Sequence, residues 1–180
     1  MDKVQQQDAR EQLNQYEVPV LDTERLQLRD FRQSDFADYL AMVSDPDVVR
    51  YVGQGEPLTS EPAWQSMAYL MGHWWLKGFG LWAVEEKASG RVIGRVGLYQ
   101  PEGWPGMELG WMIAKEHWRK GFAFEAAQAA LAASQAASLA ASQAAALAAT
   151  QAASLAASLA AALAASQAPS LAASQAAARA

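Results

Sequence analysis

The sequence has no cysteine and only two histidines among its 180 residues. The absence of cysteine excludes disulfide bonds, thiolate nucleophiles and zinc sites built on cysteine. His73 and His117 are too few for a histidine metal site without carboxylate ligands. We therefore expect no metal cofactor.

Positive charge is also scarce, because 14 Lys and Arg stand against 19 Asp and Glu, for a formal net charge of -5. Nucleic-acid-binding domains usually carry a basic surface, so no nucleic-acid partner is expected. The polar N-terminal segment lacks the apolar run of a secretory signal. Ser and Gln interrupt the C-terminal segment too often for a membrane span of about 20 apolar residues. We expect a cytoplasmic protein that does not associate with membranes.

Acidic residues, glycine and aromatic residues are all missing after Glu125. That segment consists of Ala, Ser, Gln and Leu with one Thr, one Pro and one Arg. The composition predicts three parts: a polar leader over 1–19, a head over 20–127 and a low-complexity tail over 128–180. Alanine buries little area per residue, so the core must come from the head.

The tail composition predicts a single long helix from about Glu116, because alanine is the strongest helix former, with a break near Pro169. Its leucines recur every four or eight residues, so they spiral around the helix and form neither a stripe nor a heptad seam. We expect little of the tail to be buried. Three interpretations are open: a designed or computer-generated sequence, placeholder letters for unidentified side chains, or a true Ala-rich structural helix.

The head shows alternating strand and helix patterns. Period-two alternation and turn residues predict strands over 23–31, 81–86, 91–100 and 107–114, with the second and third forming a hairpin. Helical spacing predicts a short helix that starts at Ser34 and a second helix over 61–77. The last strand leads into a polar loop and a further helix.

That last loop, Trp118-Arg119-Lys120-Gly121-Phe122-Ala123, carries the clearest chemical signal. Backbone N–H groups at a helix N-terminus lack intrahelical partners and favour an anion such as phosphate. Gly121 would let the backbone approach a ligand closely, and Arg119 and Lys120 add positive charge. The alternative is a turn glycine beside two solvated basic residues.

Several motifs occur together and in order: TERLQLRDF, SDFADYL with DPDVVRYV, GFGLWAVEEKASGRVIGRVGLY, and ELGWMI running into HWRKGFAFEA. In this arrangement the chain resembles the GNAT superfamily of N-acetyltransferases, in particular its RimJ/RimL-like branch, over about residues 20–127. The resemblance implies an α/β fold with a GNAT-like mixed sheet and flanking helices, here followed by the long Ala-rich helical tail.

The resemblance implies an enzyme that transfers an acetyl group from acetyl-CoA to a primary amine, on a protein N-terminus or a small molecule, and we also expect a homodimer. The family's pyrophosphate-binding signature, Q/R-x-x-G-x-G/A, falls on the six residues Trp118, Arg119, Lys120, Gly121, Phe122 and Ala123, where Trp118 departs from the usual first residue. By the same likeness, backbone groups of Met112, Ile113 and Ala114 would pair with pantetheine and place an N–H near the thioester oxygen.

Glu108, on the strand before the loop, is the candidate general base; a solvent-facing strand residue is the alternative. The tail departs from the family, because no closing strands are legible there and no Tyr follows Tyr99 to protonate the thiolate. Strand 107–114 would then be an exposed sheet edge. The competing function is therefore a catalytically inactive acyl-CoA-binding scaffold with a structural Ala-rich helix.

Overall fold

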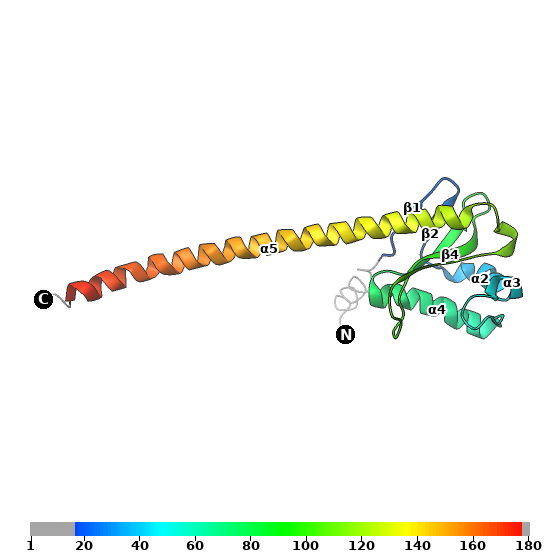
Figure 1. The fold of residues 1–180 in the computed structure, drawn as a ribbon, viewed down its shortest axis with the longest axis horizontal. Coiled ribbons are helices and arrows are strands. Elements are labelled where there is room, and N and C mark those ends of the chain that lie inside the picture. Colours follow the sequence, from blue (N-terminus) through cyan, green and yellow to red (C-terminus); the bar gives the residue numbers. More distant parts are fainter. Residues whose placement is uncertain (1–16, 178–180) are drawn as a thin grey trace, which may run out of the picture. The chain divides into compact units, whose positions relative to one another are not determined.

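The computed structural model describes residues 17–177 (Figure 1). Residues 1–16 of the expected polar leader and the last three residues of the tail lie outside the described residues. The chain divides into two compact units, one up to Ser134 and one from Gln135. The first unit thus includes residues 128–134, which the composition had placed in the tail.

The strands are β1 (Leu21–Asp22), β2 (Leu26–Arg29), β3 (Leu81–Glu86), β4 (Arg91–Tyr99) and β5 (Glu108–Ile113). The α-helices are α2 (Phe36–Val43), α3 (Pro46–Val49), α4 (Ser60–Lys77) and α5 (Phe122–Ala177), and short 3-10 helices are η1 (Gln33–Asp35) and η2 (Lys115–His117). The expected α/β class with flanking helices and a long C-terminal helix is confirmed. None of the helices within residues 17–177 is long and apolar enough to cross a bilayer.

The five strands form one sheet in sequence order, and each neighbouring pair is antiparallel. The mixed sheet that the resemblance implied would need a parallel pair, and none occurs within residues 17–177. The hairpin predicted from the 87–90 turn is present as β3 and β4. Strand β5 pairs with β4 and with no other strand among the described residues, so it forms an edge of the sheet. The exposed edge expected from the sequence is therefore present.

Each face of the sheet has its own core, as Figure 1 shows for α4 on one side and the first turns of α5 on the other. Period-two alternation along β3 explains this, because Leu81 and Ala83 lie in one cluster and Trp82 and Val84 in the other. The first cluster is shared with α2, α3 and α4. The second includes Leu26 and Leu28 of β2, together with Phe122, Ala126 and Ala130 of α5.

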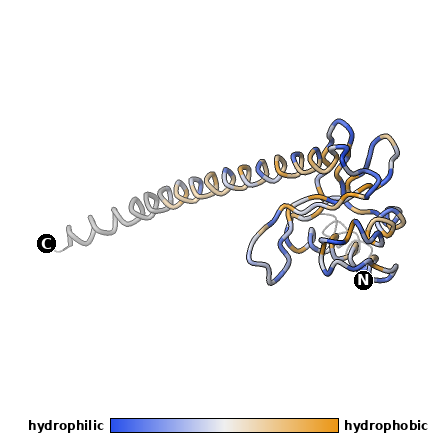
Figure 2. Tube along the Cα trace, turned by 45° about the vertical axis from the view of Figure 1, so that its right-hand side comes forward, coloured by the Kyte–Doolittle hydropathy of each residue, from blue (hydrophilic) through white to orange (hydrophobic). Residues whose placement is uncertain are grey.

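Helix α5 is buried only in its first turns. Phe122, Ala126 and Ala130, spaced by four residues, face the sheet, and the two alanines are fully buried. From Gln135 onward the described side chains are exposed, including Leu139 at 61%, Leu147 at 60% and Leu155 at 63%. Figure 2 shows apolar and polar residues intermixed along this part of the helix. The expected exposure of the leucines is confirmed where their side chains are described.

Two expectations for α5 are wrong. The helix does not begin near Glu116 but at Phe122, because residues with positive φ come just before it. It also continues through Pro169 to Ala177 without a break. A proline removes one backbone donor and strains the preceding turn, and here that local cost does not end the helix.

We predict that removing the residues after Ser134 leaves the free energy of unfolding unchanged within about 0.5 kcal/mol, since these side chains are exposed. Removing those after Gln128 also deletes the buried Ala130 and should cost about 1–2 kcal/mol. Urea denaturation followed by tryptophan fluorescence measures both, and circular dichroism should report lost helix in each case. Equal destabilisation by the two truncations would contradict this boundary.

Candidate active site

The chain leaves the sheet at the end of β5 and makes a tight loop before α5. The N–H of Ala114 donates to the Ile93 carbonyl at 2.8 Å, and η2 follows. Arg119 then has φ 61° and Gly121 φ 82°, both in the left-handed region. These two residues turn the chain so that α5 begins at Phe122.

Six consecutive backbone N–H groups, from Arg119 to Phe124, have no acceptor among residues 17–177. The first N–H in this stretch with a helical bond belongs to Glu125, which donates to the Gly121 carbonyl at 3.0 Å. Unpaired N–H groups at a helix N-terminus, aligned with the helix dipole, bind anions. We name residues 119–124 the donor loop.

The donor loop also carries two basic side chains that make no ion pair within residues 17–177. Arg119 and Lys120 are exposed, and neither lies within ion-pair distance of a carboxylate in the described part of the chain. Trp118, just before the loop, donates its indole N–H to the Ile113 carbonyl at 2.7 Å. The site therefore offers an anion both backbone donors and two free cations.

The side chain of Phe122 does not face a ligand. It is buried in the core beneath Arg25, whose guanidinium carbon lies 4.4 Å from the ring centroid. Only the backbone N–H of Phe122 is open to a bound anion. Phe122, one of the six residues of the pyrophosphate signature, is therefore a core residue. It contributes only its backbone N–H to the donor loop.

A cavity of about 230 Å³ lies at the β5 edge beside the donor loop, and it brings together four of the residues singled out in the sequence. They are Met112, Ile113, Trp118 and Ala123, joined by Val48, Val52 and the exposed Trp111. Val48 comes from the short helix α3. The cavity places β5 and the start of α5 around one apolar space.

The register of β4 and β5 decides which backbone groups of β5 face the open edge. The Ala114 N–H bonds to the Ile93 carbonyl of β4. In an antiparallel strand the N–H groups of alternate residues point to the same side, so the N–H of Met112 also points toward β4. The N–H groups of Leu109, Trp111 and Ile113 therefore point away from β4. Of the three residues expected to pair with pantetheine, only Ile113 presents its N–H to the edge.

Glu108 begins β5 and is exposed, with no cation within ion-pair distance among the described residues. Tyr99 lies directly opposite in the β4–β5 register. Burial, with smaller contributions from Tyr69, raises the pKa of Tyr99 to about 12, so its phenol stays protonated at neutral pH. Glu108 thus begins the strand opposite a tyrosine whose phenol is neutral.

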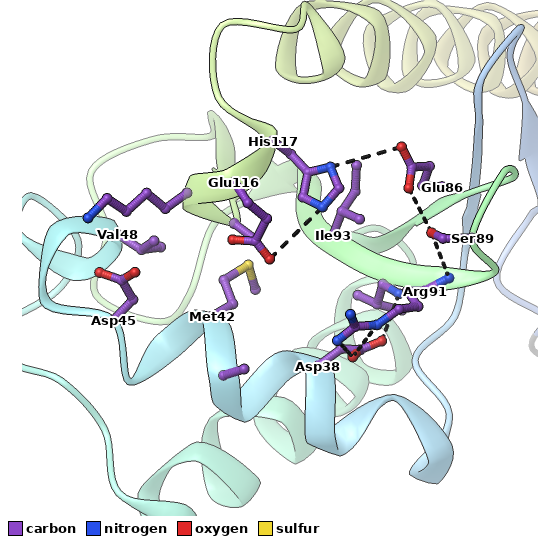
Figure 3. Close-up of a pocket in the computed structure, with 14 residues that line it drawn as sticks. Asp38, Met42, Asp45, Val48, Glu86, Ser89, Arg91, Ile93, Glu116 and His117 are labelled. Carbon is purple, nitrogen blue, oxygen red and sulfur yellow. Dashed lines mark hydrogen bonds and ion pairs between the residues drawn. The ribbon is translucent and has the colours of Figure 1, made fainter.

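The two histidines lie outside the donor loop. His73 is buried, with Nδ1 2.8 Å from the Phe79 carbonyl oxygen and Nε2 accepting the Gln100 N–H at 3.4 Å, so both ring nitrogens have a partner in the core. His117 lies in a second cavity of about 180 Å³ between α2 and β4 (Figure 3). Its ring nitrogens are each 4.0 Å from a carboxylate oxygen, of Glu86 and of Glu116.

Charged groups around that second cavity are largely paired with one another. Figure 3 shows Arg91 beside Asp38, whose carboxylate also accepts the Val92 N–H at 3.2 Å. No group of three or more metal-ligating side chains is present within residues 17–177. His117 Nδ1, which lines this cavity, is buried and has no hydrogen-bond partner among the described residues.

One set of contacts, between the β1–β2 turn and the start of α5, was not predicted from the sequence. Arg25 donates Nη1–H to the Lys120 carbonyl at 2.9 Å and Nε–H to Glu125 at 2.7 Å. Glu125 also accepts the Thr23 hydroxyl at 2.5 Å. Burial opposes ionisation of Glu125, but these hydrogen bonds outweigh it and hold its pKa below the usual value.

A family model described as an acetyltransferase (GNAT) domain matches residues 25–176. The chain belongs to the GNAT acetyltransferase family. The family resemblance seen in the ordered motifs is therefore confirmed.

Similar proteins include YkkB of Bacillus subtilis (strain 168), 34% identical over 61% of this chain and 64% of its own length. An uncharacterized N-acetyltransferase of the same organism, YoaA, is 31% identical over 59% of this chain and 61% of its own length. This GNAT chain thus spans less than two thirds of the length of these curated relatives.

Solved GNAT structures show the same arrangement. An acetyltransferase from Agrobacterium tumefaciens is 31% identical with a TM-score of 0.55, covering 64% of this chain and 66% of its own. A GNAT-family acetyltransferase from Bacillus anthracis is 27% identical with a TM-score of 0.53, covering 63% and 64%.

We predict that Gly121→Val lowers the affinity for CoA at least about tenfold, roughly 1.4 kcal/mol. The reason is backbone strain, because Gly121 has a φ of 82° that a β-branched residue rarely adopts. Crowding contributes little, since a Cβ here would meet only Arg25 Nη2 at 3.4 Å. Isothermal titration measures the change. Gly103→Val is the matched control, because Gly103 has φ 83° and open space around it but lies in the β4–β5 loop. An unchanged affinity in folded Gly121→Val would remove the donor loop from the site.

Proposed function

We propose that this chain binds acetyl-CoA and transfers its acetyl group to a primary amine, on a protein N-terminus or a small molecule. One observation carries the proposal: after the open-edged strand β5 and the short η2, six N–H groups have no acceptor within residues 17–177, in a chain of the GNAT family. The donor loop fits a pyrophosphate, and Arg119 and Lys120 would add attraction. Location in the cytoplasm and a homodimer remain predictions.

The open edge of β5 suits the pantetheine arm, because amide groups of the arm can pair with strand N–H and C=O groups as another strand would. Outward N–H groups occur at Leu109, Trp111 and Ile113. Glu108 and Ile113 are separated by about 17 Å at a strand rise of about 3.4 Å per residue. A thioester within reach of Glu108 would therefore take its oxyanion donor from Leu109 or Trp111, which lie nearer to Glu108 than Ile113 does.

Glu108 would act as the general base, directly or through one water. The amine nitrogen attacks the thioester carbonyl carbon, its proton passes to Glu108, and the carbon–sulfur bond breaks to release the CoA thiolate. The exposed position of Glu108, without an ion-pair partner among the described residues, leaves the carboxylate available for this proton. Solvent at the open edge would return a proton to the thiolate.

A second candidate function is acyl-CoA binding without turnover. Two observations favour it: no strand follows β5 within residues 17–177, and no tyrosine follows Tyr99 in the sequence. Titration with acetyl-CoA and an acetylation assay with several primary amines separate the two functions. Binding with release of free CoA thiol supports transfer, binding alone supports the scaffold, and no binding contradicts both.

We predict that Glu108→Gln lowers kcat at neutral pH by about 10²-fold or more and leaves CoA affinity nearly unchanged, since only proton transfer is disturbed. Steady-state kinetics over a range of pH measures this. Glu102→Gln is the control: Glu102 has a fully exposed side chain six residues before Glu108. Equal kcat values in parent and Glu108→Gln would make Glu108 a solvent-facing strand residue.

A further inference from the structure

We infer that Arg25 and Glu125 are positioning residues that hold the donor loop in its anion-binding conformation. The inference rests on the proposed function and goes beyond it, because neither residue belongs to the pyrophosphate signature. They come from segments 100 residues apart in the sequence, and Arg25 reaches the Lys120 carbonyl of the loop. We name the pair the latch.

The Arg25 half of the latch holds a peptide group of the loop. Its Nη1–H donates to the Lys120 carbonyl at 2.9 Å. In a trans peptide the carbonyl and the following N–H point in opposite directions, so the Gly121 N–H is directed away from Arg25. The same guanidinium stacks on Phe122 with 4.4 Å to the ring centroid. Arg25 thus orients a donor at the centre of the loop.

The Glu125 half fixes Arg25 and the first turn of α5. Glu125 accepts the Arg25 Nε–H at 2.7 Å, the Arg25 backbone N–H at 2.9 Å and the Thr23 hydroxyl at 2.5 Å. Thr23 is itself rigid, because its backbone N–H donates to the Leu26 carbonyl at 2.9 Å. Charge-assisted bonds to a closed turn make the carboxylate a fixed anchor.

The loop needs such an anchor because its backbone N–H groups supply none. The N–H groups of residues 119–124 make no hydrogen bond to the described residues, and Arg119 holds a left-handed φ of 61° that a non-glycine residue adopts at a cost. Surrounding contacts must therefore maintain this conformation. The latch is the set of side-chain contacts that reaches the Lys120 carbonyl.

A matched pair elsewhere in the same unit separates positioning from general stability. Asp38 accepts from Arg91 Nη2 at 2.5 Å and from the Val92 N–H at 3.2 Å, as Glu125 accepts from an arginine side chain and a backbone N–H. The side chains of Glu125 and Asp38 are 17% and 19% exposed. Asp38→Asn is therefore the control for Glu125→Gln.

The test uses the full chain as parent, Glu125→Gln and Asp38→Asn. Trypsin cleavage after Lys120, without ligand, reports the loop conformation, because Arg25 holds the carbonyl that trypsin attacks. Isothermal titration compares CoA with acetylpantetheine, which lacks the pyrophosphate. For Glu125→Gln we expect cleavage at least fivefold faster and CoA affinity at least tenfold lower, with acetylpantetheine affinity unchanged. Asp38→Asn should match the parent in all three.

Two results would overturn the latch: parent-like cleavage and CoA affinity in Glu125→Gln, or an equal loss of affinity for both ligands, which indicates general destabilisation. Urea denaturation of each variant identifies the second case. A parent chain that binds no CoA contradicts the proposed function instead. The cleavage rate after Lys120 then decides by itself whether the latch holds the loop.

Discussion

Close pairing of β4 with β5 at Gly94 determines where the chain leaves the sheet. A Cβ on Gly94 would lie 2.5 Å from both the Met112 carbonyl oxygen and Ile113 Cδ1, so any side chain there would push the strands apart. The next bond, from the Ala114 N–H to the Ile93 carbonyl, closes the ladder. Helix η2 and then the donor loop follow beyond this point, and the position of the loop depends on that missing side chain.

The same pairing sets the chemistry of the strand edge, because the phase of an antiparallel ladder decides which N–H groups face outward. Trp118 then completes the end of β5 by donating its indole N–H to the outward carbonyl of Ile113. The departure of Trp118 from the usual Gln or Arg thus has a structural use. Its side chain caps the strand, and attraction for an anion is left to Arg119, Lys120 and the backbone.

Strands, helices and the loop glycine could be predicted because their signals are local: period-two alternation in 81–86, helical spacing in 61–77, and Gly121 before a helix. The latch could not, since Arg25 and Glu125 lie 100 residues apart and each alone reads as a solvated charge. Burial of Ala130 was missed for a related reason. An alanine in an alanine-rich segment carries no pattern, and only the sheet beneath it distinguishes it from its neighbours.

Binding and turnover have different structural requirements in this chain. The donor loop, its latch and the edge of β5 all lie before Ala126, and the core that supports them is complete once Ala130 packs on the sheet. These parts depend on no side chain after Ser134 that the structure describes. The proposed acetyl transfer would need more, because an amine would have to be held against the open side of β5 near Glu108. The described residues provide α3 and Trp111 at that edge and no further strand, so in the proposed function CoA binding has more structural support than acetyl transfer.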